Sequence, residues 1–103
     1  MNNNMKNEDI VSEIFAFLNK TAGVELENVS LKDGLELDLG ITGDDAYDLI
    51  SAFSTKFNVD ISRFIFAEYF HAEPSVFSFK QTKKNKELTI QKLLEAVISK
   101  TLE

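Results

Sequence analysis

The sequence lacks cysteine and tryptophan, and it has only one histidine and one proline among 103 residues. Without cysteine there is no disulfide, no thiolate nucleophile and no zinc–thiolate cluster, and one histidine excludes a site built from several. No apolar run approaches the roughly 20 residues of a membrane span. The Asn-rich start lacks the basic and apolar regions of a signal peptide. We therefore expect a cytoplasmic protein with no membrane span and no metal site.

Positive charge is also scarce, since 17 acidic residues face 11 basic ones and the net charge is -6. Binding to duplex DNA depends on Lys and Arg, so this balance argues against nucleic acid and suits a basic protein partner. A chain of this size, 44% hydrophobic, supports one core. We expect a disordered N-terminus over residues 1–6 and a single, monomeric domain over residues 7–103.

Two segments in the first half of the chain have apolar residues at helical spacing. The first covers residues 7–20, with Asn7 as the expected N-cap and Gly23 as the stop. The second covers residues 43–57, where Thr42 followed by Asp45 approximates a capping box. Residues 24–41 alternate like a strand, but Gly34 and other turn signals interrupt them, so we predict a long loop pinned by its leucines.

The second half contains an aromatic segment and a final helix. Residues 60–70 form either a short helix or an irregular aromatic plug, which Pro74 ends, and residues 71–88 form a polar connection. A last helix is expected over residues 89–101, with Thr89 as its N-cap. We expect Phe53, Phe64, Phe66 and Phe70 to fill the volume between helices. Together these elements predict an all-α bundle of three to four helices.

The most informative stretch is DLGITGDDAYDLI, over residues 38–50. It resembles the prosthetic-group loop and second helix of acyl carrier proteins, in which Asp-Leu-Gly leads to an Asp-Ser-Leu whose serine carries phosphopantetheine. The order of elements is also similar, with a long loop after the first helix and a short third helix. The resemblance implies an acyl-carrier-like bundle with a long loop between its first two helices.

The sequence departs from that family at the attachment position. Counting from Asp38, the family's serine falls on Gly43, which has no hydroxyl to form a phosphodiester, so we expect no 4'-phosphopantetheine. The sequence also resembles an uncharacterised bacterial group of acyl-carrier-like proteins that has Gly-Asp-Asp here, followed by a Phe-x-Phe-x-x-Tyr-Phe segment like that at residues 64–70. The resemblance therefore implies a carrier-like protein without cargo.

Acidic residues are concentrated around the same motif. Residues 24–60 hold nine acidic and two basic residues. In acyl carrier proteins such a surface meets basic patches on partner enzymes, and the resemblance implies the same use here. We expect a non-catalytic interaction module with four partner-binding residues: Asp38, Asp44, Asp45 and Asp48. A merely solvated acidic face remains the alternative.

Two other functions remain open. One is a genuine acyl carrier protein of fatty-acid or secondary metabolism, modified at another hydroxyl such as Thr42 or Ser51. The other is a small regulator that binds nucleic acid or lipid through a lysine-rich loop, for which a solvated loop is the plain alternative. Its contact residues would be Lys80, Lys83, Lys84 and Lys86.

Overall fold

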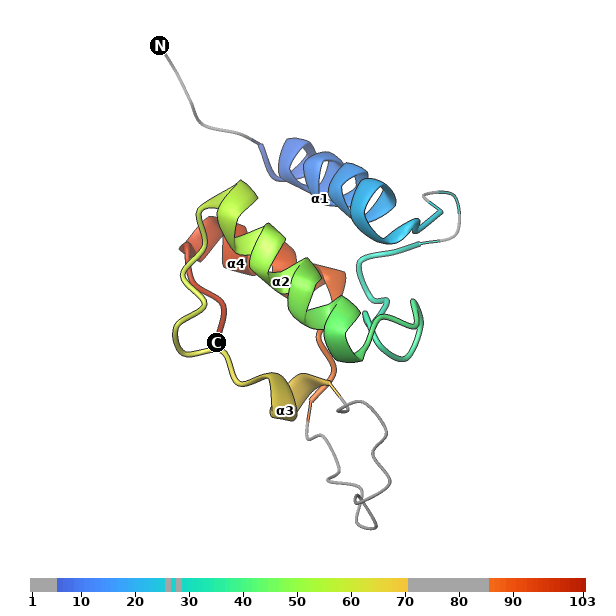
Figure 1. The fold of residues 1–103 in the computed structure, drawn as a ribbon. Coiled ribbons are helices and arrows are strands. Elements are labelled where there is room, and N and C mark those ends of the chain that lie inside the picture. Colours follow the sequence, from blue (N-terminus) through green and yellow to red (C-terminus); the bar gives the residue numbers. More distant parts are fainter. Residues whose placement is uncertain (1–5, 26, 28, 71–85) are drawn as a thin grey trace.

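The computed structural model describes residues 6–25, 27, 29–70 and 86–103. Within these ranges the chain forms four helices and no strand (Figure 1): α1 (Asn7–Ala22), α2 (Gly43–Phe57), α3 (Phe66–Tyr69) and α4 (Ile90–Ser99). The predicted all-α bundle is confirmed. None of the helices in the described ranges has the length and apolar character needed to cross a bilayer.

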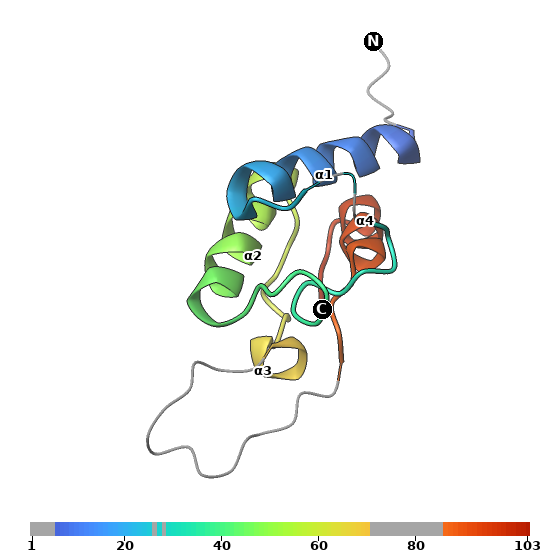
Figure 2. The ribbon, with the colours of Figure 1, turned by 90° about the vertical axis from the view of Figure 1, so that its right-hand side faces the viewer.

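The three longer helices bury one apolar face each around a common core. Helix α1 packs against both α2 and α4, and Figure 2 shows it lying across these two helices, with α3 at the opposite end. Phe17 of α1 contacts Phe53 of α2, with ring centroids 6.1 Å apart. Each helix contributes four buried side chains: Ile10, Ile14, Phe17 and Leu18 from α1; Ala46, Leu49, Ile50 and Phe53 from α2; Ile90, Leu93, Leu94 and Ala96 from α4.

The helix boundaries follow the sequence signals closely. Helix α2 has the predicted bounds. Helix α1 continues two residues beyond the predicted end, to Ala22, and the expected stop, Gly23, is its C-cap, with a left-handed φ of 70°. The predicted N-cap of α1 was wrong by one residue, because Lys6 occupies that position in an extended conformation. Thr89 is the N-cap of α4, and its hydroxyl accepts a hydrogen bond from the Lys92 amide at 3.2 Å.

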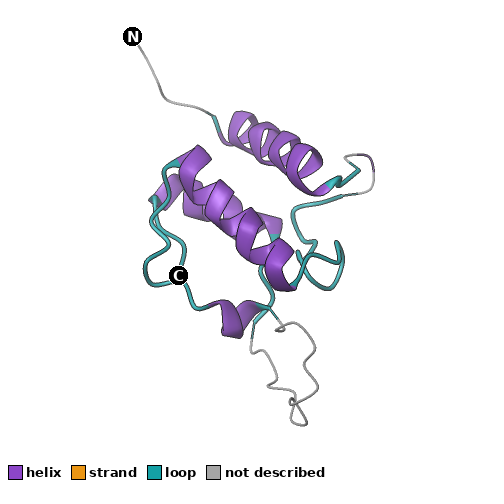
Figure 3. Ribbon diagram, in the orientation of Figure 1, coloured by secondary structure: helices purple, strands orange, loops and turns teal. Residues whose placement is uncertain are grey.

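The described residues between 24 and 41 form a loop, as predicted, and Figure 3 shows no strand among them. Its apparent alternation does not reflect a sheet, because among the described residues the loop forms one isolated β-bridge, and no ladder, with the residues that lead into α4. Gly34 and Thr89 form an isolated antiparallel bridge. On either side of it the Leu35 amide donates to the Leu88 carbonyl at 2.8 Å, and the Ile90 amide donates to the Asp33 carbonyl at 3.1 Å. The loop is thereby fixed to the start of α4.

A carboxylate strengthens this connection. Oε2 of Glu87 accepts hydrogen bonds from the backbone amides of Glu36 and Leu37, each at 3.0 Å. Gly34 is buried against the Glu87 side chain, and a Cβ atom at position 34 would collide with that carboxylate. A side chain at position 34 would force the Glu87 side chain to move away from the loop backbone that it holds.

The aromatic segment contains a short helix, and both predicted descriptions apply to it. Tyr69 of α3 is only 1% exposed, stacks on Phe64 with centroids 4.9 Å apart, and donates its hydroxyl to the Glu103 carbonyl at 3.0 Å. Phe53, Phe64 and Phe70 are buried, and Phe66 packs half-buried against the core. The aromatic side chains thus extend the core from α2 to α3, and the Tyr69 hydroxyl fixes the last residue of the chain to this cluster.

We predict that Gly34→Ala lowers the free energy of unfolding by about 1–3 kcal/mol, because the new methyl group displaces the Glu87 carboxylate from two backbone amides. Urea denaturation of the purified variant measures the loss. The control is the same substitution in a Glu87→Ala background, where the effect should shrink. An equal loss in both backgrounds would show that the collision with Glu87 is not the cause.

Candidate docking surface

The N-terminus of α2 begins with a left-handed residue. Gly43 has φ of 61°, a conformation that a residue with a Cβ adopts only with strain. Thr42 is the N-cap, as predicted, but its side chain makes no capping hydrogen bond. The predicted capping box with Asp45 is therefore wrong, because the Thr42 hydroxyl donates instead to the Glu36 carboxylate in the neighbouring turn. The left-handed backbone at position 43 favours a glycine there.

Three of the four predicted partner-binding acids lie exposed on α2. Asp44 and Asp45 belong to its first turn, where negative charge is favourable to the helix dipole, and Asp48 follows one turn later. In the described part of the chain, the side chains of Asp45 and Asp48 take part in no hydrogen bond or ion pair. Asp38 differs, because its Oδ2 accepts a hydrogen bond from the Gly34 amide at 2.7 Å and closes the loop turn. The structure thus brings together the α2 acids and gives Asp38 a local structural contact.

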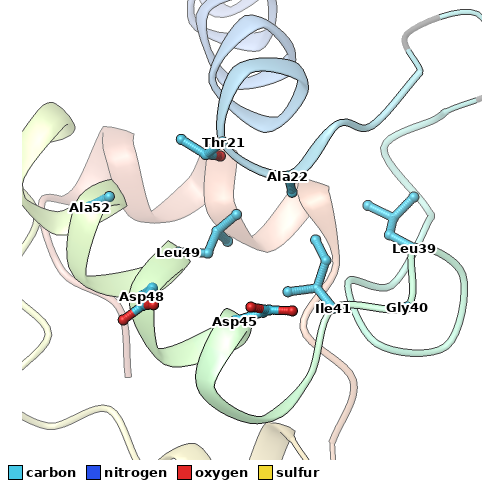
Figure 4. A pocket seen from close by; sticks show the side chains of 9 residues that line it. All are labelled: Thr21, Ala22, Leu39, Gly40, Ile41, Asp45, Asp48, Leu49 and Ala52. Carbon is cyan, nitrogen blue, oxygen red and sulfur yellow. The ribbon is translucent and has the colours of Figure 1, made fainter.

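An open cavity of about 540 Å³ lies beside these acids. Figure 4 shows Leu49 of α2 and Ile41 of the loop pointing toward the end of α1, with the carboxylates of Asp45 and Asp48 along the α2 side. Its lining residues come from three elements: Thr21 and Ala22 from α1; Leu39, Gly40 and Ile41 from the loop; Asp45, Asp48, Leu49 and Ala52 from α2. Sequence reasoning missed this cavity, since no local pattern places the end of α1 against residues 39–41.

The cavity has an additional source of negative potential. Thr21 and Ala22 are the last two residues of α1, and a helix C-terminus carries the negative end of its dipole. A second groove adjoins the cavity further along α1 and α2 and shares Thr21 and Ala52 with it. That groove contains charges of both signs, including an ion pair between Lys56 Nζ and Glu13 Oε1 at 3.8 Å. The negative potential is thus concentrated at the Asp45 end.

Of the four predicted contact residues in the lysine-rich segment, the structure describes Lys86. The other three, Lys80, Lys83 and Lys84, lie outside the described residues. Lys86 pairs with Glu68 of α3, with Nζ and Oε1 3.1 Å apart. This hydrogen bond to the carboxylate raises the pKa of Lys86 above the ordinary lysine value. Lys86 therefore has a structural role in joining α3 to the segment before α4.

In the described ranges, no three His, Cys, Asp or Glu side chains are grouped closely enough to hold a metal ion. The cavity is lined by the acids Asp45 and Asp48, by Thr21, and by small or aliphatic residues. Its chemistry is that of a surface that attracts a cation and buries apolar area. These are the properties of a docking surface.

Comparison with known proteins places the chain in a family. The family model described as "Protein of unknown function (DUF1493)" matches residues 7–100. The chain belongs to the DUF1493 family. The match covers the four described helices and the loop between α1 and α2. No curated protein and no solved structure matches the sequence.

Membership of the DUF1493 family corrects the resemblance drawn from residues 38–50. The chain was expected to be acyl-carrier-like, but the family model that matches it is not one of an acyl carrier protein family. The motif was misleading because turn residues before a helix and acidic residues in its first turn are common at helix N-termini in unrelated proteins, where the acids interact favourably with the helix dipole. At the decisive position, Gly43 has a left-handed backbone conformation that a serine would adopt only with strain.

We predict that Gly43→Ala lowers the free energy of unfolding by about 1 kcal/mol, because alanine is strained at this φ. Gly43→Asn serves as the matched variant and should lose less, since asparagine tolerates the left-handed region better than alanine does. Thermal and urea unfolding of the two variants give the comparison. Equal stability of Gly43→Ala and wild type would contradict the role assigned to this backbone conformation.

We predict that Glu68→Gln returns the pKa of Lys86 toward the ordinary lysine value, because the substitution removes the carboxylate that favours the ammonium ion. In the wild type, the stabilisation from this pair is present below the ordinary lysine pKa and is lost as pH rises through the raised value. An NMR titration of the lysine side chains follows the shift. Glu95→Gln on α4 is the control and should leave the Lys86 titration unchanged; an unchanged Lys86 in Glu68→Gln would refute the assignment.

Proposed function

We propose that this DUF1493 protein is a non-catalytic interaction module that docks a partner protein through α2 and the loop before it. The observation that carries the proposal is the exposure of Asp44, Asp45 and Asp48 on one helix beside an open cavity that polar and aliphatic side chains line together. An acidic face alone is common on soluble proteins. The combination with a cavity supplies both features that recognition needs, a charged rim and apolar area to bury.

Electrostatics indicates the kind of partner. Asp45 and Asp48 have no ion pair within the described residues, so no described cation neutralises the negative potential that they create. A complementary basic patch would raise the association rate and select against acidic proteins, with an effect that salt weakens. The partner is therefore expected to present Lys or Arg residues around an apolar contact.

An exposed aromatic side chain on α2, that of Tyr47, is also consistent with binding of a partner protein. Tyr47 is 58% exposed, and its ring lies 5.2 Å from that of Phe66 on α3, measured between centroids. Tyrosine offers large contact area at low entropic cost and is enriched where proteins bind each other. Leu37, in the loop before α2, is 74% exposed. The acids of α2 are thus flanked by apolar groups on the same elements.

We predict that charge reversal on α2 reduces partner capture at least fivefold. The experiment compares bead-immobilised wild type, Asp44→Lys and Asp48→Lys as baits for the same cell extract, with quantitative mass spectrometry of the captured proteins. The reversed charge repels a basic patch and also removes an attraction, so both variants should lose the same proteins. Wild-type capture of those proteins should fall as salt rises.

The matched control is Glu95→Lys on α4, which makes the same charge change on an exposed residue of another helix. It should retain the proteins that the α2 variants lose. Equal recovery by all four baits would defeat the proposal. Equal loss by Glu95→Lys and the α2 variants would show that net charge, rather than the α2 surface, governs capture.

A further inference from the structure

We propose that the cavity bounded by the end of α1, residues 39–41 and α2 receives an arginine side chain from the docked partner. This inference rests on the proposed function and assigns the recognition element within that surface. It follows from three properties of the cavity: its size, the separation of its apolar and acidic walls, and its place at the C-terminus of a helix.

The cavity suits a long side chain with an apolar stem. Its volume of about 540 Å³ exceeds what a methyl or isopropyl group fills. Leu39, Ile41 and Leu49 provide aliphatic walls, and Leu49 and Ile41 belong to the buried core, which holds them in place. The methylene stem of an arginine covers such surface while its charged end remains near water.

The acidic rim lies where the charged end of that side chain would be. Asp45 and Asp48 are three residues apart on α2 and therefore lie on the same side of the helix, and both line the cavity. Their carboxylates lack partners within the described ranges. The C-terminus of α1, at Thr21 and Ala22, adds its dipole from the opposite wall. A cation in this position is attracted from two sides.

Arginine fits this arrangement better than lysine. Its guanidinium is planar, has five donors and is more weakly hydrated than an ammonium, so it interacts with two carboxylates and loses less hydration when it lies against apolar walls. The adjoining groove does not compete for it, because Lys20 and Lys56 line that groove and Lys56 already faces Glu13. The cavity near Asp45 is thus the cation-selective part of the α1–α2 surface.

The test is a ¹⁵N NMR titration of the full chain with N-acetyl-L-arginine methylamide. The citrulline analogue, which has the same shape but a neutral urea, is the matched probe. We expect millimolar binding of the arginine probe, with amide shifts centred on Leu39, Ile41 and Leu49, and at least fivefold weaker binding of the citrulline probe. Equal affinity for both probes, or shifts spread over all acidic surfaces, would overturn the proposal.

Two variants locate the site. Asp45→Asn/Asp48→Asn should weaken arginine binding at least fivefold, whereas Glu8→Gln/Asp9→Asn, which removes two charges from the first turn of α1, should leave it within twofold. Ala22→Leu fills the cavity without changing charge and should also abolish the shifts. It keeps the proposal falsifiable if the Asp45/Asp48 variant unfolds. Unchanged binding by Ala22→Leu, or equal loss in both charge variants, would refute the cavity assignment.

The outcome separates this inference from the proposed function. If the α2 charge reversals reduce protein capture but the arginine probe does not bind in the cavity, the docking surface stands and the arginine assignment fails. If neither effect occurs, both fail. Concentration-dependent self-association in sedimentation experiments that Ala22→Leu abolishes would identify a second copy of this chain as the occupant and would overturn the inference.

Discussion

The position of the proposed docking surface depends on one long-range interaction, the attachment of the α1–α2 loop to the residues before α4. The Glu87 carboxylate binds two loop amides, and the Gly34–Thr89 bridge fixes the loop backbone beside it. Residues 39–41 follow directly and form one wall of the cavity. Helix packing alone leaves a loop of this length many conformations, so these hydrogen bonds select the one in which the cavity exists.

The acids of α2 combine two roles that are usually in conflict. Negative charge in the first turn stabilises the helix. This favourable interaction of Asp44 and Asp45 with the helix dipole offsets part of the repulsion among the acids on the exposed face. Asp48 lies beyond the first turn, where the dipole contributes little, and it lines the cavity. Its charge is therefore not explained by helix stability. Since no described side chain pairs with Asp48, its charge is suited to an external cation.

Local signals in the sequence predicted the helices well, because apolar spacing, the Thr89 N-cap and the Gly23 C-cap all act within a few residues. The alternation over residues 24–41 was correctly assigned to a loop because Gly34 interrupts it. The same sequence did not reveal that Gly34 faces Glu87, a contact more than 50 positions distant. The cavity was missed for the same reason. Gly43 was identified as unusual, but its positive φ is a property of the folded backbone.

The attachment of the loop also affects the order in which the protein folds during synthesis. Helices α1 and α2 leave the ribosome first, whereas Leu88, Thr89 and the rest of α4 are made after them. Until those residues are available, the loop lacks its anchoring hydrogen bonds and α1 lacks one of its two packing partners. A nascent chain therefore cannot assemble the complete cavity early. The sequence separation of these contacts therefore delays formation of the proposed docking surface until α4 has been made.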